Sequence, residues 1–206
     1  MTGTSWNAKL APLPPLSGCV ALVPVKGFSA AKARLAPALG PSERALFARS
    51  MAEHVLGAIA PLVTAVVCDN PEVAAWAVER GALLLEEPGL GLNGAVTAGV
   101  YALAEAGADE VLVVHADLPL ASGLAGLAGH DGVTLVPDRR EDGTNVACVP
   151  AHAGFRFSYG PGSFRRHCDE AARLNLDLRV VHDLVLAWDV DVPADIPAGL
   201  GPFHDR

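Results

Sequence analysis

Asp117 is the residue around which a reaction could be built, because it follows an apolar run. The stretch 110–119 reads Glu-Val-Leu-Val-Val-His-Ala-Asp-Leu-Pro. A short apolar run bounded by turn signals is typical of a strand buried on both faces of a parallel sheet, and Pro119 must end it. Ligands bind at the carboxyl ends of such strands. Asp117 could hold a divalent metal with phosphates or cap the next helix, and the stretch alone favours neither.

Three cations, Lys26, Lys32 and Arg34, follow the first predicted strand within nine residues. In α/β proteins, phosphate-binding loops often lie directly after a first strand. This loop has one glycine and is neither a P-loop nor a dinucleotide-binding fingerprint. A solvated basic turn is the alternative, but these are three of only 15 lysines and arginines in an acidic chain. The clustering favours a site for the phosphates of a ligand.

Asp189 and Asp191 form a second acidic candidate near the end of the sequence. They are two residues apart in a segment that we expect to be extended, so their side chains point to the same face. Two like charges on one face are unfavourable unless they are solvated or share a cation. The pair therefore indicates a metal site, and the alternative is that one aspartate caps a helix beginning at Pro193.

Polar turns supply the remaining candidates. Asn93 lies in a glycine-broken loop, 86–95, where its amide could read a base edge or cap the following helix. Thr144 follows a polar loop that returns as a strand. The turn from Gly160 to Ser163 leads into a helix with two arginines close behind. A helix N-terminus, a hydroxyl and an arginine pair suit an anion, and a well-capped surface helix is the alternative.

Strands that alternate with helices must position these residues. Apolar runs predict strands at 19–25, 63–68, 82–85, within 110–119, and at 133–136, 146–149 and 178–181. Helical spacing predicts helices at 41–60, 72–80, 96–104, 122–127 and 163–174. This alternation indicates β-α-β units with right-handed crossovers. We expect an α/β fold with a mostly parallel mixed sheet in a Rossmann-like, three-layer sandwich.

Composition narrows the class of protein. The 206 residues, 51% of them hydrophobic, suffice for one domain, which we place at 19–206 after a flexible N-terminal tail, 1–18. A net charge of −8 argues against nucleic acid as a partner, and no apolar run is long enough for a membrane helix. Four scattered cysteines without a C-x-x-C pair predict reduced core residues of a cytoplasmic protein, rather than a zinc site or a disulfide framework. Histidine spacing does not suggest a zinc enzyme.

Nucleotidyl transfer typically needs cationic side chains that bind phosphates and carboxylates that bind a hard divalent metal ion. The candidate residues provide both. The motifs also resemble, across residues 19–197, the phospholactate/phosphoenolpyruvate guanylyltransferases of deazaflavin-coenzyme biosynthesis. Their joint order is specific, above all Gly-Thr-Asn before Tyr-Gly-Pro-Gly-Ser. Val192 stands where threonine is frequent, an exchange that does not alter the expected activity. The motif segments are 23–26, 31–35, 91–93, 116–119, 143–145, 159–164 and 189–195.

The resemblance implies a GT-A-like nucleotidyltransferase that joins GMP from GTP to a three-carbon phosphoacid and releases pyrophosphate. It implies Mg²⁺ on Asp117 and on Asp189 or Asp191. Phosphoenolpyruvate or 2-phospho-L-lactate would be the phosphoacid, and the residues that match its ligands are Thr144, Gly160 and Ser163. Charge on the triphosphate would be stabilised by the catalytic cations, namely Lys26, Lys32 and Arg34. Nucleotide binding would involve Lys26 again, with Asn93 at the guanine end.

Two alternatives remain open at this stage. One is nucleotidyl transfer to another acceptor, such as 3-phosphoglycerate or a molybdopterin. The first loop, however, lacks the Gly-Gly-x-Ser-x-Arg-Met pattern that is typical of molybdopterin guanylyltransferases. The other is a noncatalytic nucleotide-sensing domain, against which the intact Asp117, Asp189 and Asp191 argue. The sequence fixes neither the acceptor nor the oligomeric state, including whether the chain forms a homodimer.

Overall fold

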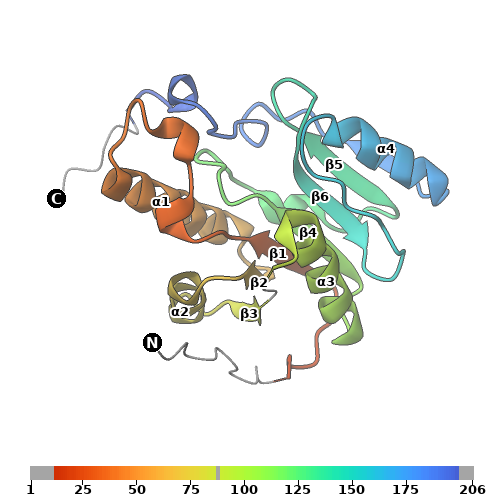
Figure 1. The fold of residues 1–206 in the computed structure, drawn as a ribbon. Coiled ribbons are helices and arrows are strands. Elements are labelled where there is room, and N and C mark those ends of the chain that lie inside the picture. Colours follow the sequence, from red (N-terminus) through yellow and green to blue (C-terminus); the bar gives the residue numbers. More distant parts are fainter. Residues whose placement is uncertain (1–11, 87–88, 200–206) are drawn as a thin grey trace.

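A seven-stranded sheet forms the centre of the computed structural model, which describes residues 12–86 and 89–199 (Figure 1). The strands are β1 (Cys19–Pro24), β2 (Val63–Cys68), β3 (Leu83–Glu86), β4 (Glu110–Val114), β5 (Val133–Pro137), β6 (Thr144–Pro150) and β7 (Leu178–Val180). Their spatial order is β3-β2-β1-β4-β6-β5-β7. Strand β6 is antiparallel to both neighbours, β4 and β5, and the other pairings are parallel. The predicted mostly parallel, mixed sheet is confirmed.

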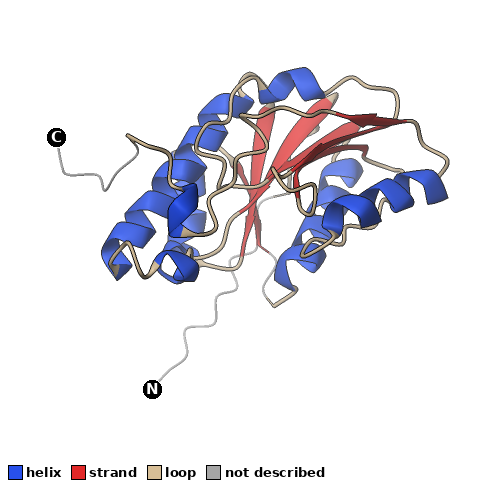
Figure 2. Ribbon diagram, turned by 90° about the horizontal axis from the view of Figure 1, so that it is seen from above, coloured by secondary structure: helices blue, strands red, loops and turns tan. Residues whose placement is uncertain are grey.

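Helices cover both faces of the sheet, which confirms the predicted three-layer sandwich (Figure 2). Helices α1 (Pro41–Ile59) and α2 (Pro71–Glu79) pack on one face, and α3 (Gly91–Glu105) and α4 (Ser163–Arg173) on the other. Short 3₁₀ turns lie at Phe28–Ala30, Ala33–Leu35, Leu124–Leu127 and Pro193–Asp195. Among the described residues, no helix has the length and apolar character needed to cross a membrane.

Strand β4 lies in the middle of the sheet and is buried on both faces. Val111 and Val113 pack on the side of α3 and α4, whereas Leu112 and Val114 pack on the side of α1 and α2. All four side chains are 0% exposed. Burying each one contributes roughly 1.5–3 kcal/mol to folding, which explains why this run is continuously apolar rather than alternating.

The directions of β4 and β6 bring two distant segments to one edge. Because β6 is antiparallel, its first residue, Thr144, lies beside the end of β4, where Val114 pairs with Val146. The His115 N–H continues the pairing by donating to the Asn145 carbonyl at 3.1 Å. The chain that follows β4 and the chain that enters β6 therefore meet at the ligand edge of the sheet.

The segment before β1 is described from residue 12 onward. Leu13 and Leu16 pack against the core beneath α3, and the Leu16 N–H donates to the Ala106 carbonyl at 2.8 Å. Residues 1–11 lie outside the described part of the chain. The division into a tail, 1–18, and a domain, 19–206, stays a prediction.

Candidate active site

Lys32 and Asp117 form an ion pair at the ligand edge. Asp117 follows β4, and Lys32 lies between two 3₁₀ turns in the loop after β1. The Lys32 Nζ is 2.6 Å from the Asp117 Oδ2 and donates a second hydrogen bond to the Val190 carbonyl at 2.7 Å. The Lys32 backbone is left-handed (φ 57°, ψ 39°), which is uncommon for a residue other than glycine. Such strain persists where the surroundings over-determine it, often at functional sites.

The electrostatic surroundings keep the Asp117 carboxylate ionised. Burial opposes ionisation, but the charges of Lys32 and His115 and the hydrogen bond from Lys32 outweigh it and hold the pKa of Asp117 below its usual value. Its second oxygen, Oδ1, is buried and has no hydrogen-bond partner among the described residues. An unpaired buried acceptor costs about 1–3 kcal/mol, so a charged carboxylate oxygen in this position is suited to a cation.

Asp191 and Asp189 lie beside this ion pair. The Asp191 Oδ1 is 3.7 Å from the Lys32 Nζ, and its Oδ2 is 3.4 Å from the Arg34 Nη1. Burial, and next the charge of Asp117, raise the pKa of Asp189 to about 6. The three predicted metal ligands are therefore close enough for their charges to interact.

The capping alternative for these two aspartates is wrong. The 3₁₀ turn Pro193–Asp195 has Val192 at its N-cap position. The Asp195 carboxylate accepts the backbone N–H groups of Asp191 and Val192 at 3.0 and 2.8 Å. The turn supplies its own cap and leaves the Asp189 and Asp191 carboxylates available for other partners.

One cavity of about 370 Å³ opens at this edge of the sheet. Its wall includes the backbone and apolar side chains of the loop after β1, and an apolar part comes from Phe28 and Met51. The polar residues that line it are Lys26, Lys32, Arg34, His115, Asp117 and Asp191. The structure thus brings the three predicted cations and two of the three predicted acids to one place.

The donor set fits a hard divalent cation. Carboxylate oxygens are the ligands that Mg²⁺ prefers in proteins. Asp117 offers an unpartnered oxygen, and the pKa of about 6 at Asp189 reflects, after burial, an excess of negative charge that a cation would relieve. Lys32 already neutralises part of this charge through its contacts with Asp117 and Asp191.

Thr144 is held by a buried histidine. The His167 Nδ1 is 2.9 Å from the Thr144 Oγ1, and the Ser158 N–H donates to the His167 Nε2 at 2.9 Å. Because Nε2 accepts, the neutral ring carries its proton on Nδ1 and donates to the threonine. Burial, with the nearby Arg166 charge, lowers the pKa of His167 to about 4. The Thr144 hydroxyl proton therefore remains free to be donated to a ligand.

The turn from Gly160 to Ser163 is tied to the loop that precedes Thr144. The Gly162 N–H donates to the Asp142 carboxylate at 3.0 Å. Gly160 and Gly162 have φ of 116° and 73°, values that favour glycine. Ser163 is 1% exposed in the first turn of α4. The Arg166 guanidinium donates to the Pro161 and Ser158 carbonyls, which helps to hold this turn, and its role toward an anion stays a prediction.

Asn93 connects α3 to the same turn. Its Oδ1 accepts the Tyr159 N–H at 2.6 Å, and its Nδ2 donates to the Tyr159 carbonyl at 3.4 Å. The alternative that Asn93 caps α3 is wrong, because the helix begins at Gly91 and Leu90 occupies the N-cap position. One amide proton and one lone pair of Asn93 stay available, and its neighbour Leu92 lines the cavity.

Comparison with known proteins identifies the family. The family model described as "Guanylyl transferase CofC like" matches residues 19–199. The chain belongs to this CofC-like family. A phosphoenolpyruvate guanylyltransferase of Sphaerobacter thermophilus is 40% identical over 186 residues, which cover 86% of this chain and 90% of that protein. A 2-phospho-L-lactate guanylyltransferase of Halorubrum lacusprofundi is 36% identical over 176 residues (80% and 76%).

Solved structures agree with the fold of the CofC-like family. A nucleotidyl transferase from Methanothermobacter aligns with a TM-score of 0.60 at 15% identity, over 86% of this chain and 93% of the other. The predicted nucleotidyltransferase fold and the predicted guanylyltransferase family are confirmed. A nucleotidyltransferase family points to a divalent metal ion, in keeping with the donor set at Asp117.

Two histidines of this CofC-like protein received no role from sequence reasoning. His115 lines the cavity, its Nε2 is buried without a partner among the described residues, and its ring lies 4.8 Å from that of Tyr159. The Tyr159 ring in turn lies 5.0 Å from His167. These rings connect the charged cavity to Thr144. The only local signal for His167 was its place four residues after Ser163, on the same face of α4.

Proposed function

We propose that the protein transfers GMP from GTP to the phosphate of a three-carbon phosphoacid, phosphoenolpyruvate or 2-phospho-L-lactate, and releases pyrophosphate. The observation that carries the proposal is the Lys32–Asp117 ion pair in a cavity lined by two further cations. The product belongs to deazaflavin-coenzyme biosynthesis, and we place the reaction in the cytoplasm. The relatives named above act, by their names, on these two acceptors.

The reaction needs charge neutralisation more than proton transfer. An acceptor phosphate oxygen attacks the α-phosphorus of GTP, a new P–O bond forms, and the bond to the β-phosphate oxygen breaks. Pyrophosphate leaves with the bonding electrons. The attacking oxygen is already anionic at neutral pH, so no general base is required. Catalysis then rests on positioning and on preorganised charge.

Lys26, Lys32 and Arg34 are the catalytic cations of this proposal. Lys32 uses two of its three N–H donors for Asp117 and the Val190 carbonyl, which leaves one for a phosphate oxygen. Lys26 and Arg34 are exposed at the cavity and can reach the outer phosphates. Asn93 would contact the guanine end with its remaining amide proton and lone pair.

Mg²⁺ is the ion that we propose for the carboxylates. Asp117, with Asp189 or Asp191, would hold it. When bound, such an ion neutralises charge on the phosphate oxygens and helps to orient them. The chain's own part is to keep Asp117 ionised and its Oδ1 free, which the pairing of Lys32 with Oδ2 accomplishes.

Thr144, Gly160 and Ser163 would hold the acceptor. The Thr144 hydroxyl accepts from His167, so its own proton would be the donor to the acceptor in this proposal. The N–H groups of Gly162, Ser163 and Phe164 at the start of α4 already donate to Asp142 or to the Gly160 carbonyl. The donors that we propose for the anionic phosphoacid are therefore the Gly160 N–H and the Ser163 hydroxyl. Because Thr144 and His167 are buried and neutral, we expect them to select the acceptor by its shape and hydrogen-bonding groups rather than by its charge.

The deciding experiment is pyrophosphate release from GTP and Mg²⁺ with one acceptor in each reaction: phosphoenolpyruvate, 2-phospho-L-lactate or 3-phosphoglycerate. We expect turnover with one of the first two. ATP and CTP in place of GTP serve as controls. Turnover with 3-phosphoglycerate alone would show that the proposed acceptor is wrong. The absence of pyrophosphate release with all three acceptors, from a folded protein that binds GTP, would contradict the proposal.

A further inference from the structure

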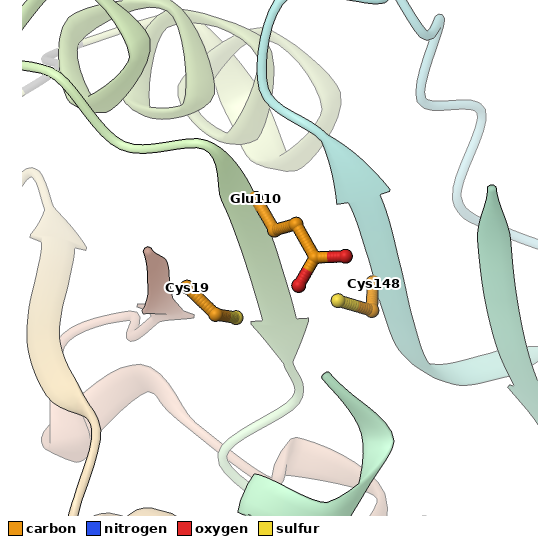
Figure 3. Close-up of side chains that lie close together, drawn as sticks. All are labelled: Cys19, Glu110 and Cys148. Atoms are coloured by element: carbon orange, nitrogen blue, oxygen red, sulfur yellow. The ribbon is translucent and has the colours of Figure 1, made fainter. Parts of the chain in front are cut away.

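Two thiols and a carboxylate converge at the edge of the sheet opposite the candidate active site (Figure 3). They belong to Cys19, the first residue of β1, Glu110, the first residue of β4, and Cys148 in β6. Their ligand atoms all lie within 4.8 Å of one another. The cluster lies at the first residue of β4, and Asp117 follows the last. Because β4 spans ~13 Å between its two ends, the cluster is distinct from the cavity around Asp117.

The strand register explains the convergence. Cys19 pairs with Glu110 across β1 and β4, and Cys148 pairs with Leu112 across β4 and β6. Glu110 and Leu112 are two residues apart and so share one face of the sheet. The sulfurs of Cys19 and Cys148 therefore approach each other over β4 from its two flanking strands.

A disulfide does not explain this pair of cysteines. Their strands are separated by β4, which places the two backbones ~9.6 Å apart. A disulfide needs its Cα atoms within about 6.8 Å. Both cysteines are instead free thiols on the two strands that flank β4, with sulfurs within 4.8 Å of each other. The thiolate is the form of cysteine that binds metals, so binding here would release the thiol protons.

We propose that Cys19, Glu110 and Cys148 bind one thiophilic divalent metal ion, with zinc as the chemical type. Two thiolates and a carboxylate are a recognised zinc donor set, and a fourth, open position would take water. Zinc ligands lie roughly 3.3–3.8 Å apart, so the observed cluster needs only a small contraction. Cys19 and Glu110 are half-buried, which leaves an entry path, whereas Cys148 is 3% exposed.

Neighbouring groups support such a site. The Glu110 Oε2 accepts the Gly129 N–H at 2.8 Å, which orients the carboxylate and leaves Oε1 for the metal. Two thiolates and a carboxylate around a divalent ion carry one net negative charge. The Arg179 guanidinium, held by the Leu127 carbonyl at 2.6 Å, supplies a positive charge near Cys148 that would offset part of this negative charge.

The consequence of binding would be structural. The metal would link β1, β4 and β6 at the edge remote from chemistry, so it should raise the thermal stability of the protein and leave pyrophosphate release unchanged. Mg²⁺ would not compete, because it prefers oxygen ligands. The proposal is independent of the function proposed above.

The test is a titration of the full-length, reduced protein with Co²⁺, and then Zn²⁺, in the presence of excess Mg²⁺. The thiolate-to-cobalt charge-transfer band reports sulfur ligands alone, so metal bound to the Asp117 region stays silent. We expect one equivalent bound, an increase of the melting temperature with Zn²⁺, and at least a hundredfold weaker binding in C19S and in C148A. We expect E110Q to weaken binding about tenfold.

C168S is the matched control, because Cys168 is a half-buried cysteine on α4, away from the cluster. It should bind like the wild type. Circular dichroism verifies that each variant is folded, and if C148A fails to fold, C19S at its half-buried position decides. Absence of the charge-transfer band in the wild type, or a band that survives in C19S, would overturn the proposal.

Discussion

Lys32 and Asp117 are joined by opposite charges at the wall of an open cavity, whereas Thr144 and His167 are joined by a hydrogen bond between neutral groups. The side chains of the first pair are 13% and 23% exposed. Those of the second pair are 1% and 0% exposed. A partly exposed ion pair can exchange partners when a charged ligand arrives, because water and the ligand both compensate for the change. A buried neutral bond has no such substitute.

We expect the two pairs to have different tasks. The charged side, with Lys32 and Asp117, suits a ligand whose charge changes during reaction, as we propose for the triphosphate when pyrophosphate leaves. The neutral side, with Thr144 and His167, suits a ligand that must be selected by shape before reaction. Variants on the charged side should therefore affect turnover, and those on the neutral side should affect acceptor binding and protein stability.

The largest effect is expected for Asp117→Ala. Removal of this carboxylate should lower kcat for pyrophosphate release by a thousandfold or more, about 4 kcal/mol of transition-state stabilisation. The circular dichroism spectrum should stay that of the wild type. Asp69→Ala is the control, because Asp69 is exposed after β2 at the same edge but does not line the cavity. Turnover of Asp117→Ala within tenfold of the wild type would contradict the assignment.

The next effect is expected for Thr144→Val. The change keeps the shape but leaves the His167 Nδ1–H without its acceptor, which should lower the free energy of unfolding by about 1–3 kcal/mol. The acceptor kcat/KM should fall about 10- to 100-fold, with GTP binding unchanged. Thr134→Val is the matched control: this threonine is also 1% exposed and accepts a bond from Arg179, but lies in β5. Thr134→Val should lower the free energy of unfolding but leave the acceptor kcat/KM unchanged.

Acid should weaken the pair of Thr144 and His167 through the protonation of His167 in the unfolded chain. The pKa of His167 is lowered by burial to about 4, from about 6.5 in an unfolded chain, so the unfolded state binds the proton first. Stability should therefore be lost as the pH falls through this window, by roughly 2 kcal/mol between pH 7 and 5. Denaturant unfolding of the wild type and His167→Gln measures the difference. Equal losses in both proteins would exclude His167 as the source.

The smallest effect is expected for Asn93→Ala, which separates the two sides. The change removes both bonds to Tyr159 and the proposed contact with guanine. We expect KM to rise several-fold, about 1 kcal/mol, for GTP and for the acceptor alike. Steady-state kinetics with each substrate varied in turn measures both values. A change confined to one substrate would show that Asn93 serves one side only.

Most of the fold could be predicted from the sequence, because most strands and helices correspond to a local pattern of apolar runs, helical spacing or turn residues. The apolar run before Asp117 and the glycine after α2 lie within a few residues of the structure they specify. The convergence of Lys32 and Asp117 was also predictable, since the parallel strands β1 and β4 end at one edge.

The contacts within the site were not predictable to the same degree. The Lys32–Asp117 pair spans 85 residues of sequence, and the left-handed backbone of Lys32 has no signal in its neighbours. Asn93 looked like a helix cap, but its amide binds Tyr159, 66 residues away. Such pairings depend on how elements pack in space, and no periodicity or turn motif records that.

Strand β6 is reversed relative to β4, and this has a consequence for how the protein can change. The side that we propose for the nucleotide follows strands that end at the ligand edge, and the side that we propose for the acceptor follows a strand that starts there. The loop before Thr144 can therefore be lengthened or exchanged while β1 and β4 stay intact. Relatives that differ in acceptor could have diverged by such replacements, and an engineer could graft one loop onto another member to redirect it.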